Sequence, residues 1–120
     1  MDNKKEGKLA RSAIAFSVKI VQLHHRIENL GFLRNQLARA ATSIGANIHE
    51  AAYAESSTDF VHKMKIALKE CYETEYWLMV LGESCPELRE ESSFLQKEAG
   101  GLRYMLIASV NTCQQRKSFS

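Results

Sequence analysis

Apolar residues recur along the first quarter of the chain at the spacing of one long helix. The seven residues are separated by 4, 3, 4, 3, 4 and 3 positions: Leu9, Ala13, Phe16, Ile20, Leu23, Ile27 and Leu30. This spacing places all seven side chains on one face of an α-helix. Similar seams follow in the rest of the chain, so the sequence predicts four amphipathic helices over roughly residues 8–30, 32–54, 57–82 and 86–114.

Glycine, serine and proline indicate where these helices begin and end. Gly31 and Gly82 follow apolar seams and are expected to end helices. Ser56 can cap the third helix, with Asp59 placed like the acid of a capping box, and Pro86 suits the first turn of the fourth helix. One proline and six glycines in 120 residues leave little material for strand turns. The predicted fold is therefore all-α, an antiparallel up-down-up-down four-helix bundle.

The length of 120 residues suits one domain. We expect a single bundle over residues 8–115, with flexible tails at 1–7 and 116–120. No apolar run reaches the roughly 18 to 20 residues that span a bilayer, and residues 1–10 lack the apolar stretch of a secretory signal. We therefore expect a cytoplasmic protein that does not contact membranes. Cys71, Cys85 and Cys113 show no paired spacing and are interpreted as reduced thiols.

The first helix carries a second apolar stripe. Ile14, Val18 and Val21 lie roughly 150° around the helix from the first seam. A helix that is apolar on two sides is expected to be buried on both, so this stripe predicts a homo-oligomer in which it meets another subunit. The alternative is a wide apolar face that is buried within one bundle.

The stretch RAATSIGANIHEA, residues 39–51, combines small residues with a polar stripe on the second helix. Arg39, Ser43, Asn47 and Glu50 fall within roughly 80° of one another, about opposite the seam of that helix. A stripe on the third helix offers partners: Lys63, Glu70, Glu73, Thr74 and Trp77. We interpret both stripes as a helix-pairing surface, within a subunit or between subunits, because arginine can bind carboxylates with two donors. A solvated face is the alternative.

Positive charge is concentrated at the start of the chain. The net charge is only +2, but residues 1–30 hold six Lys and Arg against three Asp and Glu, and residues 55–83 hold three against six. The candidate nucleic-acid-binding residues are Lys4, Lys5, Lys8, Arg11, Lys19, Arg26 and Arg34. A ring of subunits would multiply them, so we expect weak, salt-sensitive binding of RNA or DNA without base readout.

Residues 33–81 resemble a known family. The segment LRNQLARAATSIGANIHEAAYAESSTDFVHKMKIALKECYETEYWLMVL is similar to the four-helix-bundle proteins encoded in intervening sequences of bacterial ribosomal RNA genes, often labelled a ribosomal protein family. The matching positions are Arg39, Ser43, Asn47, Glu50, Ser56, Asp59, Phe60, Lys63, Ala67, Glu70, Glu73, Thr74 and Trp77. The resemblance implies a pentameric ring. It also extends to the accessory variability determinant of diversity-generating retroelements, a basic protein that associates with a reverse transcriptase and nucleic acid.

The sequence holds no recognisable catalytic or metal-binding pattern. No Glu-x-x-His pairs, His-Glu-x-x-His, phosphate-binding loop or dinucleotide fingerprint occurs, so we expect no enzyme activity, catalytic residue, metal or cofactor. Two functions follow as hypotheses. The first is a homo-oligomeric scaffold that binds nucleic acid through the first helix, and the second is a protein adaptor that docks a partner such as a reverse transcriptase without binding nucleic acid.

Overall fold

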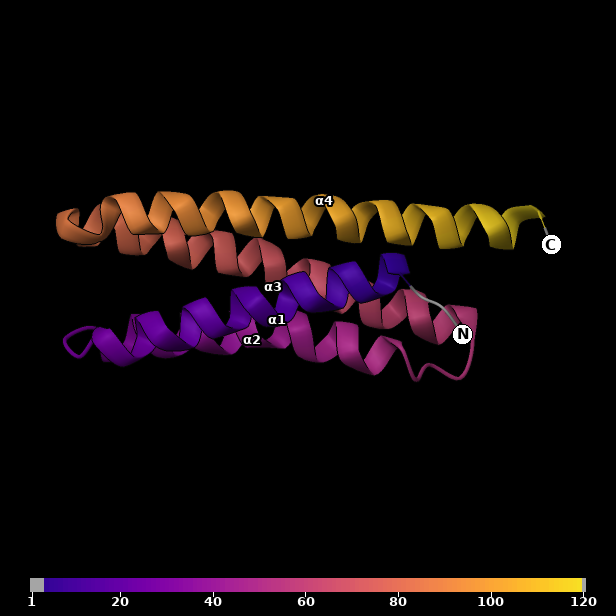
Figure 1. Cartoon of the computed structure of the whole chain (residues 1–120), viewed down its shortest axis with the longest axis horizontal. Coiled ribbons are helices and arrows are strands. Elements are labelled where there is room, and N and C mark those ends of the chain that lie inside the picture. The colour runs from indigo at the N-terminus through magenta and orange to yellow at the C-terminus, as the bar shows by residue number, and fades with distance from the viewer. Residues whose placement is uncertain (1–3, 120) are drawn as a thin grey trace.

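The chain forms four helices joined by short connections (Figure 1). The computed structural model describes the backbone of residues 4–119 and the side chains of residues 7–116. The elements are α1 (Lys4–Arg26), α2 (Gly31–Ala51), α3 (Ser57–Ser84), the short 3-10 helix η1 (Pro86–Leu88) and α4 (Arg89–Phe119). Residues 4–119 contain no strand, which confirms the all-α prediction.

Neighbouring helices run in opposite directions. Within the described chain, each helix packs against the next one and α4 packs against α1, whereas α1 does not pack against α3. Lys19 of α1 pairs with Glu98 of α4, and the later Arg26 pairs with the earlier Glu91. The hydrogen bonds between α2 and α3 and between α3 and α4 show the same reversal. This order agrees with an up-down-up-down bundle, 51 × 23 × 19 Å in extent.

The apolar seams of the four helices meet along the bundle axis. The largest completely buried apolar side chains are Ile20, Leu23, Ile44, Leu78, Leu81 and Leu106. Each contributes about 1.5–3 kcal/mol when its surface leaves water. All of the first seam except Leu30, which is partly buried, lies in this core.

The connection between α1 and α2 differs from the prediction. We expected a helix to residue 30 that ends at Gly31, but α1 ends at Arg26 and Gly31 is the first residue of α2. No glycine described has a positive φ, so Gly31 does not form a left-handed helix end. Arg34 of α2 instead donates from Nη1 to the carbonyl oxygens of Ile27, at 2.6 Å, and His24, at 3.3 Å. These bonds satisfy carbonyl groups at the end of α1, a role that was expected of a glycine turn.

The connection between α3 and α4 also differs from the prediction. Gly82 was expected to end a helix, yet it lies buried inside α3, which continues to Ser84. A Cβ atom at Gly82 would come within 3.1 Å of the Ser92 Oγ on α4, so this glycine allows the two helices to approach closely. Pro86 starts η1, and α4 begins only at Arg89.

The remaining helix ends are close to those expected. Ser56 caps α3 by accepting a 3.0 Å hydrogen bond from the Asp59 backbone N–H, as predicted. α2 ends at Ala51 and not near residue 54. Part of each expected tail is helical, because α1 already includes residues 4–7 and α4 continues through residues 116–119. Among the described residues, no helix is both long and apolar enough to cross a membrane.

Candidate functional site

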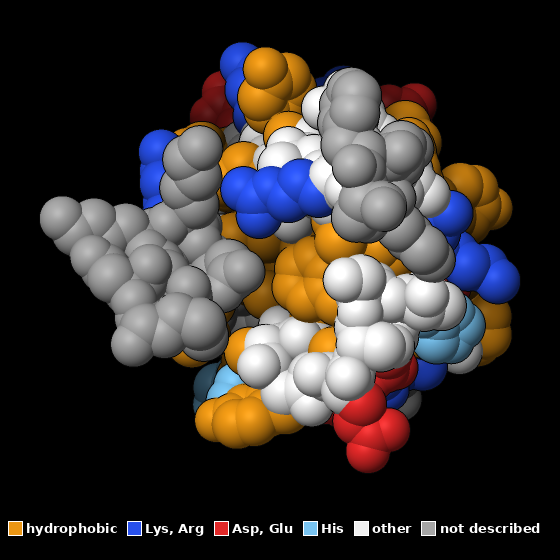
Figure 2. Space-filling view, turned by 90° about the vertical axis from the view of Figure 1, so that its right-hand side faces the viewer, with side chains coloured by type: hydrophobic (Ala, Val, Ile, Leu, Met, Phe, Trp, Pro, Cys, Tyr) orange, Lys and Arg blue, Asp and Glu red, His pale blue; other side chains and the backbone are white. Residues whose placement is uncertain are grey.

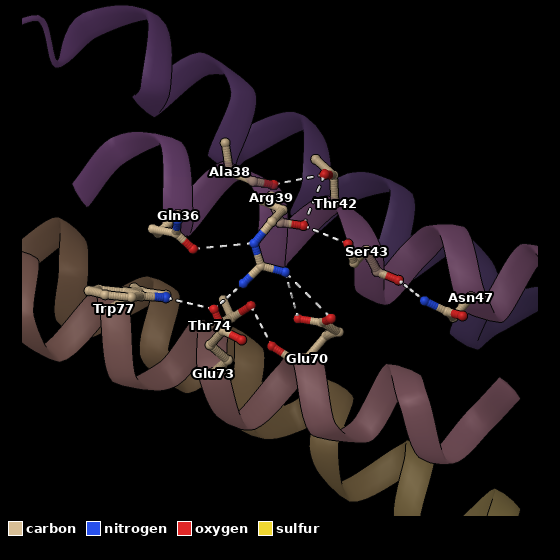
Figure 3. Close-up of polar contacts among 10 residues, drawn as sticks. All are labelled: Gln36, Ala38, Arg39, Thr42, Ser43, Asn47, Glu70, Glu73, Thr74 and Trp77. Atoms are coloured by element: carbon tan, nitrogen blue, oxygen red, sulfur yellow. Dashed lines mark hydrogen bonds and ion pairs between the residues drawn. The ribbon is translucent and has the colours of Figure 1, made fainter. Parts of the chain in front are cut away.

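The polar stripe of α2 faces α3 within the same chain, as Figure 3 shows. The Arg39 guanidinium reaches two carboxylates on successive turns of α3. Its Nη1 lies 3.3 Å from Glu70 Oε1, and its Nη2 pairs with Glu73 Oε2. Trp77 donates from Nε1 to the same Glu73 oxygen at 2.9 Å. The predicted partners of Arg39 are therefore brought together, and the contact lies within one subunit.

The electrostatics of this cluster favour its charged form. The hydrogen bond to Glu73 is the main cause that raises the pKa of Arg39. The hydrogen bond from Trp77 is the main cause that lowers the pKa of Glu73. Burial opposes this effect, and the hydrogen bond and charge of Arg39 lower the pKa further. Each shift stabilises the ionised group. The cluster therefore holds α2 and α3 together at neutral pH.

Two members of the predicted stripe do not reach α3. Ser43 donates from Oγ to the Arg39 carbonyl oxygen at 2.7 Å, and Asn47 donates from Nδ2 to the Ser43 carbonyl oxygen at 2.9 Å. Both side chains bond to backbone carbonyl oxygens of α2 itself and do not contact α3 through these bonds (Figure 3). At the end of the stripe, Lys63 Nζ does cross, to Glu50 Oε1 at 2.8 Å, and this pair raises the pKa of Lys63.

Three of the predicted nucleic-acid-binding residues also make contacts within the bundle. Lys19 Nζ lies 2.7 Å from Glu98 Oε2 and 5.1 Å from the centre of the Phe94 ring. Arg26 binds both carboxylate oxygens of Glu91, at 2.9 and 2.7 Å. Arg34 is partly buried against the end of α1, as described above, and its Nε has no hydrogen-bond partner there. These cations join neighbouring helices, so each already has a partner within the bundle.

The other predicted basic residues lie near the start of α1. Lys8 and Arg11 are exposed and form no ion pair with another side chain in the range 7–116. Lys4 and Lys5 lie in α1, but their side chains are outside the described residues. Figure 2 views the end of the bundle where α1 begins. Over the part that described side chains form, Lys and Arg side chains are separated by apolar and uncharged side chains and do not make one continuous basic patch.

The second stripe of α1 is exposed in the single bundle. Ile14, Val18 and Val21 remain 61%, 48% and 53% accessible. They form one wall of a groove of about 380 Å³ between α1 and α2, whose other wall includes Gly45 and Ala46. A Cβ atom at Gly45 would come within 3.3 Å of the Ser17 Oγ and 3.7 Å of the backbone of α1, so the helices lie close together beneath the groove. The single bundle does not cover this surface.

Sequence reasoning missed two contacts that fix the position of α3. Arg103 of α4 donates from Nε to Glu75 Oε2 at 2.9 Å, and this hydrogen bond is the main cause that raises the pKa of Arg103. Phe32 packs edge-on against Trp77, with 5.8 Å between ring centres. The sequence did offer one signal for these contacts, because Glu75 and Trp77 both border the apolar seam of α3. It did not identify their partners, which lie on other helices.

The cysteines and histidines are not gathered into a site. Across the described residues, no three His, Cys, Asp or Glu side chains are arranged to hold a metal. Cys71 is buried and donates to the Ala99 carbonyl oxygen at 3.2 Å, and burial raises its pKa to about 12. Cys85 also has a raised pKa, mainly because of burial, and Cys113 is partly buried. All three are free thiols, consistent with the sequence interpretation.

Comparisons with known proteins agree with this architecture. A family described as 23S rRNA-intervening sequence protein matches residues 5–108. Among curated proteins, none matches this chain. The structure is similar to the crystal structure of a protein with unknown function from the S23 ribosomal protein family of Bacteroides thetaiotaomicron. The two are 35% identical, with 89% of this chain and 98% of that chain covered and a TM-score of 0.83. The chain therefore belongs to the family of 23S rRNA-intervening sequence proteins.

Proposed function

We propose that this protein is a non-enzymatic scaffold that assembles with copies of itself through the α1 stripe. The observation that carries the proposal is the exposure of Ile14, Val18 and Val21 beside an apolar groove. Aliphatic side chains at one face of a helix gain about 1.5–3 kcal/mol each when they are buried completely. Because these three are about half exposed, covering them offers roughly half of that for each residue.

The shape and composition of the groove support a contact between folded proteins. Gly45 and Ala46 leave the α2 wall of the groove without large side chains, so a partner helix can approach the backbone of α2. None of the described residues that line the groove is charged. An apolar surface with few charges is typical of the core of a protein interface.

The engagement of the carboxylates supports a role without catalysis. Glu70 and Glu73 are the pair closest to a hydrolytic arrangement, and they are held by Arg39 and Trp77. A general acid requires a carboxyl whose pKa is raised toward neutral pH, whereas the pKa of Glu73 is lowered. The cytoplasm remains the proposed location.

The number of subunits can be measured directly. One subunit has a mass of 13.6 kDa, so the ring of five that the family resemblance implies has five times that mass, about 68 kDa. We expect sedimentation and light scattering to give a defined multiple of 13.6 kDa over micromolar concentrations. A folded particle of 13.6 kDa throughout this range would refute the scaffold proposal.

A charge in the groove tests the contact surface. Val18→Lys places an ammonium in the middle of the stripe at a position that is exposed in the single bundle, so the subunit should still fold. We expect at least a hundredfold weaker self-association, because an unpaired charge would be buried in the contact. Ala108→Lys, at an exposed position on α4, is the matched control and should assemble like the wild type.

Nucleic-acid binding is a second proposal, supported by the exposure of Lys8 and Arg11. Repetition of these cations around an assembly would give weak, salt-sensitive retention of RNA or DNA. Lys8→Ala with Arg11→Ala should reduce retention in a low-salt gel-shift assay, whereas Lys19→Ala should have less effect because Lys19 pairs with Glu98. If the wild type retains neither RNA nor DNA at low salt, the adaptor alternative is favoured, in which the scaffold docks a protein such as a reverse transcriptase.

A further inference from the structure

We infer that this protein can exchange α1 with a second copy of itself. In the exchanged dimer, α1 and α2 join into one continuous helix across the turn at residues 27–30, and α1 packs in the bundle of the other copy. The contacts that α1 makes there are those that it makes in the single chain, so the dimer needs no new complementary surface. The exchange uses the turn and not the groove, and is therefore independent of assembly through the α1 stripe.

The α1–α2 turn has neither a proline nor a capping side chain at the start of its second helix. Leu30 stands at the N-cap of α2 without a side-chain hydrogen bond, and no acidic residue lies in the first turn of α2. By contrast, Ser56 caps α3, and Pro86 lies between α3 and α4. Of the connections between the four helices, this one therefore carries the weakest signal for a new helix to begin.

The sequence through the turn is also compatible with a continuous helix. The apolar seam does not stop there, because its residues follow at spacings of 3, 3 and 4: Ile27, Leu30, Leu33 and Leu37. Helix-type hydrogen bonds reach the turn from both sides, from the Ile27 N–H to the Leu23 carbonyl oxygen and from the Arg34 N–H to the Leu30 carbonyl oxygen. Between them, the N–H groups of residues 28–33 donate no backbone hydrogen bond, and each would gain one in a continuous helix.

Side chains of α2 hold the chain reversal. Arg34 donates from Nη1 to the carbonyl oxygens of Ile27 and His24, and Asn35 Oδ1 lies 2.9 Å from His24 Nε2. In a continuous helix, backbone N–H groups four residues further on would donate to the same carbonyl oxygens. The Arg34 Nε is buried in the turn without a hydrogen-bond partner, and straightening would remove that cost. The turn and the continuous helix therefore satisfy the same carbonyl groups in two ways.

The position of the turn allows two bundles to share their first helices. The α1–α2 turn and the α3–α4 connection lie at one end of the bundle, and the start of α1 lies toward the other (Figure 1). Straightening carries α1 past the first end, so the two bundles lie end to end. Within the described chain, α1 does not pack against α3, and the other helices stay joined through Arg39 with Glu70 and Arg103 with Glu75. They can thus receive α1 of a second copy, as short hinges in other proteins allow.

Substitutions at Gly31 test the exchange. In the turn this is the first residue of α2, a position that accepts proline. In a continuous helix a proline there would lack the N–H and clash with the carbonyl group of residue 27. Nothing lies within 4 Å of a Cβ atom added at Gly31, so alanine also fits the turn. Every sample carries Val18→Lys to remove assembly through the stripe and is refolded from denaturant at high subunit concentration.

Native mass spectrometry should detect a dimer of twice 13.6 kDa, about 27 kDa. Gly31→Ala should raise its association constant about tenfold, because alanine is favoured in the helix interior at both hinges, whereas Gly31→Pro should abolish it. Arg34→Met removes the bonds that hold the turn and should also raise the dimer fraction. Hydrogen exchange should show residues 28–33 protected in the dimer and open in the monomer.

Circular dichroism melting checks that each variant is folded. If Gly31→Pro forms as much dimer as the parent, or if residues 28–33 exchange as fast in the dimer as in the monomer, the dimer is not an exchanged one and the inference is overturned. The same follows if Gly31→Ala and Arg34→Met remain monomeric at every concentration. None of these results depends on whether the α1 stripe assembles, because Val18→Lys is present throughout.

Discussion

Removing the Arg39 guanidinium should weaken the contact between α2 and α3 by a predictable amount. Arg39→Met keeps an unbranched side chain and a good helix former. The Arg39 side chain is 46% exposed, so its pairs with Glu70 and Glu73 fall in the range of surface ion pairs, about 0.2–1 kcal/mol each. Its removal also leaves two carboxylates three residues apart, which adds about 0.2–0.5 kcal/mol of repulsion.

We therefore expect Arg39→Met to lower the free energy of unfolding by about 0.6–2.5 kcal/mol. For a chain of this length, this corresponds to a melting temperature lower by roughly 2–10 °C. The measurement is denaturant unfolding at one fixed subunit concentration, because self-association makes apparent stability depend on concentration. Lys65→Met is the matched control, since Lys65 is an exposed residue of α3 with no ion pair to a described side chain, and it should change stability by less than about 0.5 kcal/mol.

A double-mutant cycle with Glu73→Gln isolates the ion pair. A glutamine oxygen can still accept the hydrogen bond from Trp77, so the substitution removes mainly the charge that Arg39 binds. We expect a coupling free energy of about 0.5–1 kcal/mol between the two positions. A coupling free energy indistinguishable from zero would mean that the contact in Figure 3 does not stabilise the protein in solution.

The same pair predicts how the variant responds to pH. The pKa of Glu73 is lowered below its ordinary value of 4.5 in the folded state. Its stabilising contribution is therefore complete above that value and is lost as the pH falls through the folded-state pKa. The stability difference between wild type and Arg39→Met should be constant near neutral pH and should shrink below pH 4.5. Stability curves that stay parallel through the acid range would refute this reasoning.

Three further predictions follow from the packing of glycines and cysteines. Gly101→Ala should raise the free energy of unfolding by about 1 kcal/mol, because nothing lies within 4 Å of an added Cβ atom and alanine favours the helix; thermal melting measures the change. Gly82→Val should lower it by about 1–3 kcal/mol in the same assay, because its side chain would push against Ser92. The Cys71 thiol, buried with a pKa of about 12, should resist alkylation at pH 8 in the folded protein and react only after unfolding, as peptide mass spectrometry can show.

The helices and the core could be predicted from the sequence because the spacing of apolar residues within one helix indicates which face of that helix is buried. Ile20 and Leu23 belong to the seam at 3 and 4 residue spacing, and both are completely buried. The same reasoning identified Val18 and its neighbours as a second stripe, which the bundle leaves exposed. Periodicity indicates which side of a helix is apolar, and it does so without knowledge of the other helices.

The partners of the charged side chains could not be predicted in the same way. Lys19 and Arg26 were interpreted as cations for nucleic acid, but they pair with Glu98 and Glu91. Those pairings depend on α4 lying beside α1 and on the shift of one helix relative to the other along the bundle axis. The spacing of apolar residues within one helix indicates neither. Arg39 was different, because its partners lie on the next helix along the chain and the short connection limits the possible offsets.

The positions of the ion pairs indicate which surface of the bundle is left for another protein. Neighbouring helices are joined by Lys19 with Glu98 for α1 and α4, by Arg39 with Glu70 for α2 and α3, and by Arg103 with Glu75 for α3 and α4. Among the described side chains, α1 and α2 share no ion pair and are joined by Arg34 at the turn, by a hydrogen bond between His24 and Asn35, and by close packing at Gly45. Where small residues form the contact between two helices, the solvent-facing side of that contact is apolar. Where ion pairs border the contact, its solvent-facing side is hydrated. The groove therefore occurs at the one junction of neighbouring helices where the described side chains form no ion pair, so a second protein that covers it does not have to desolvate an ion pair.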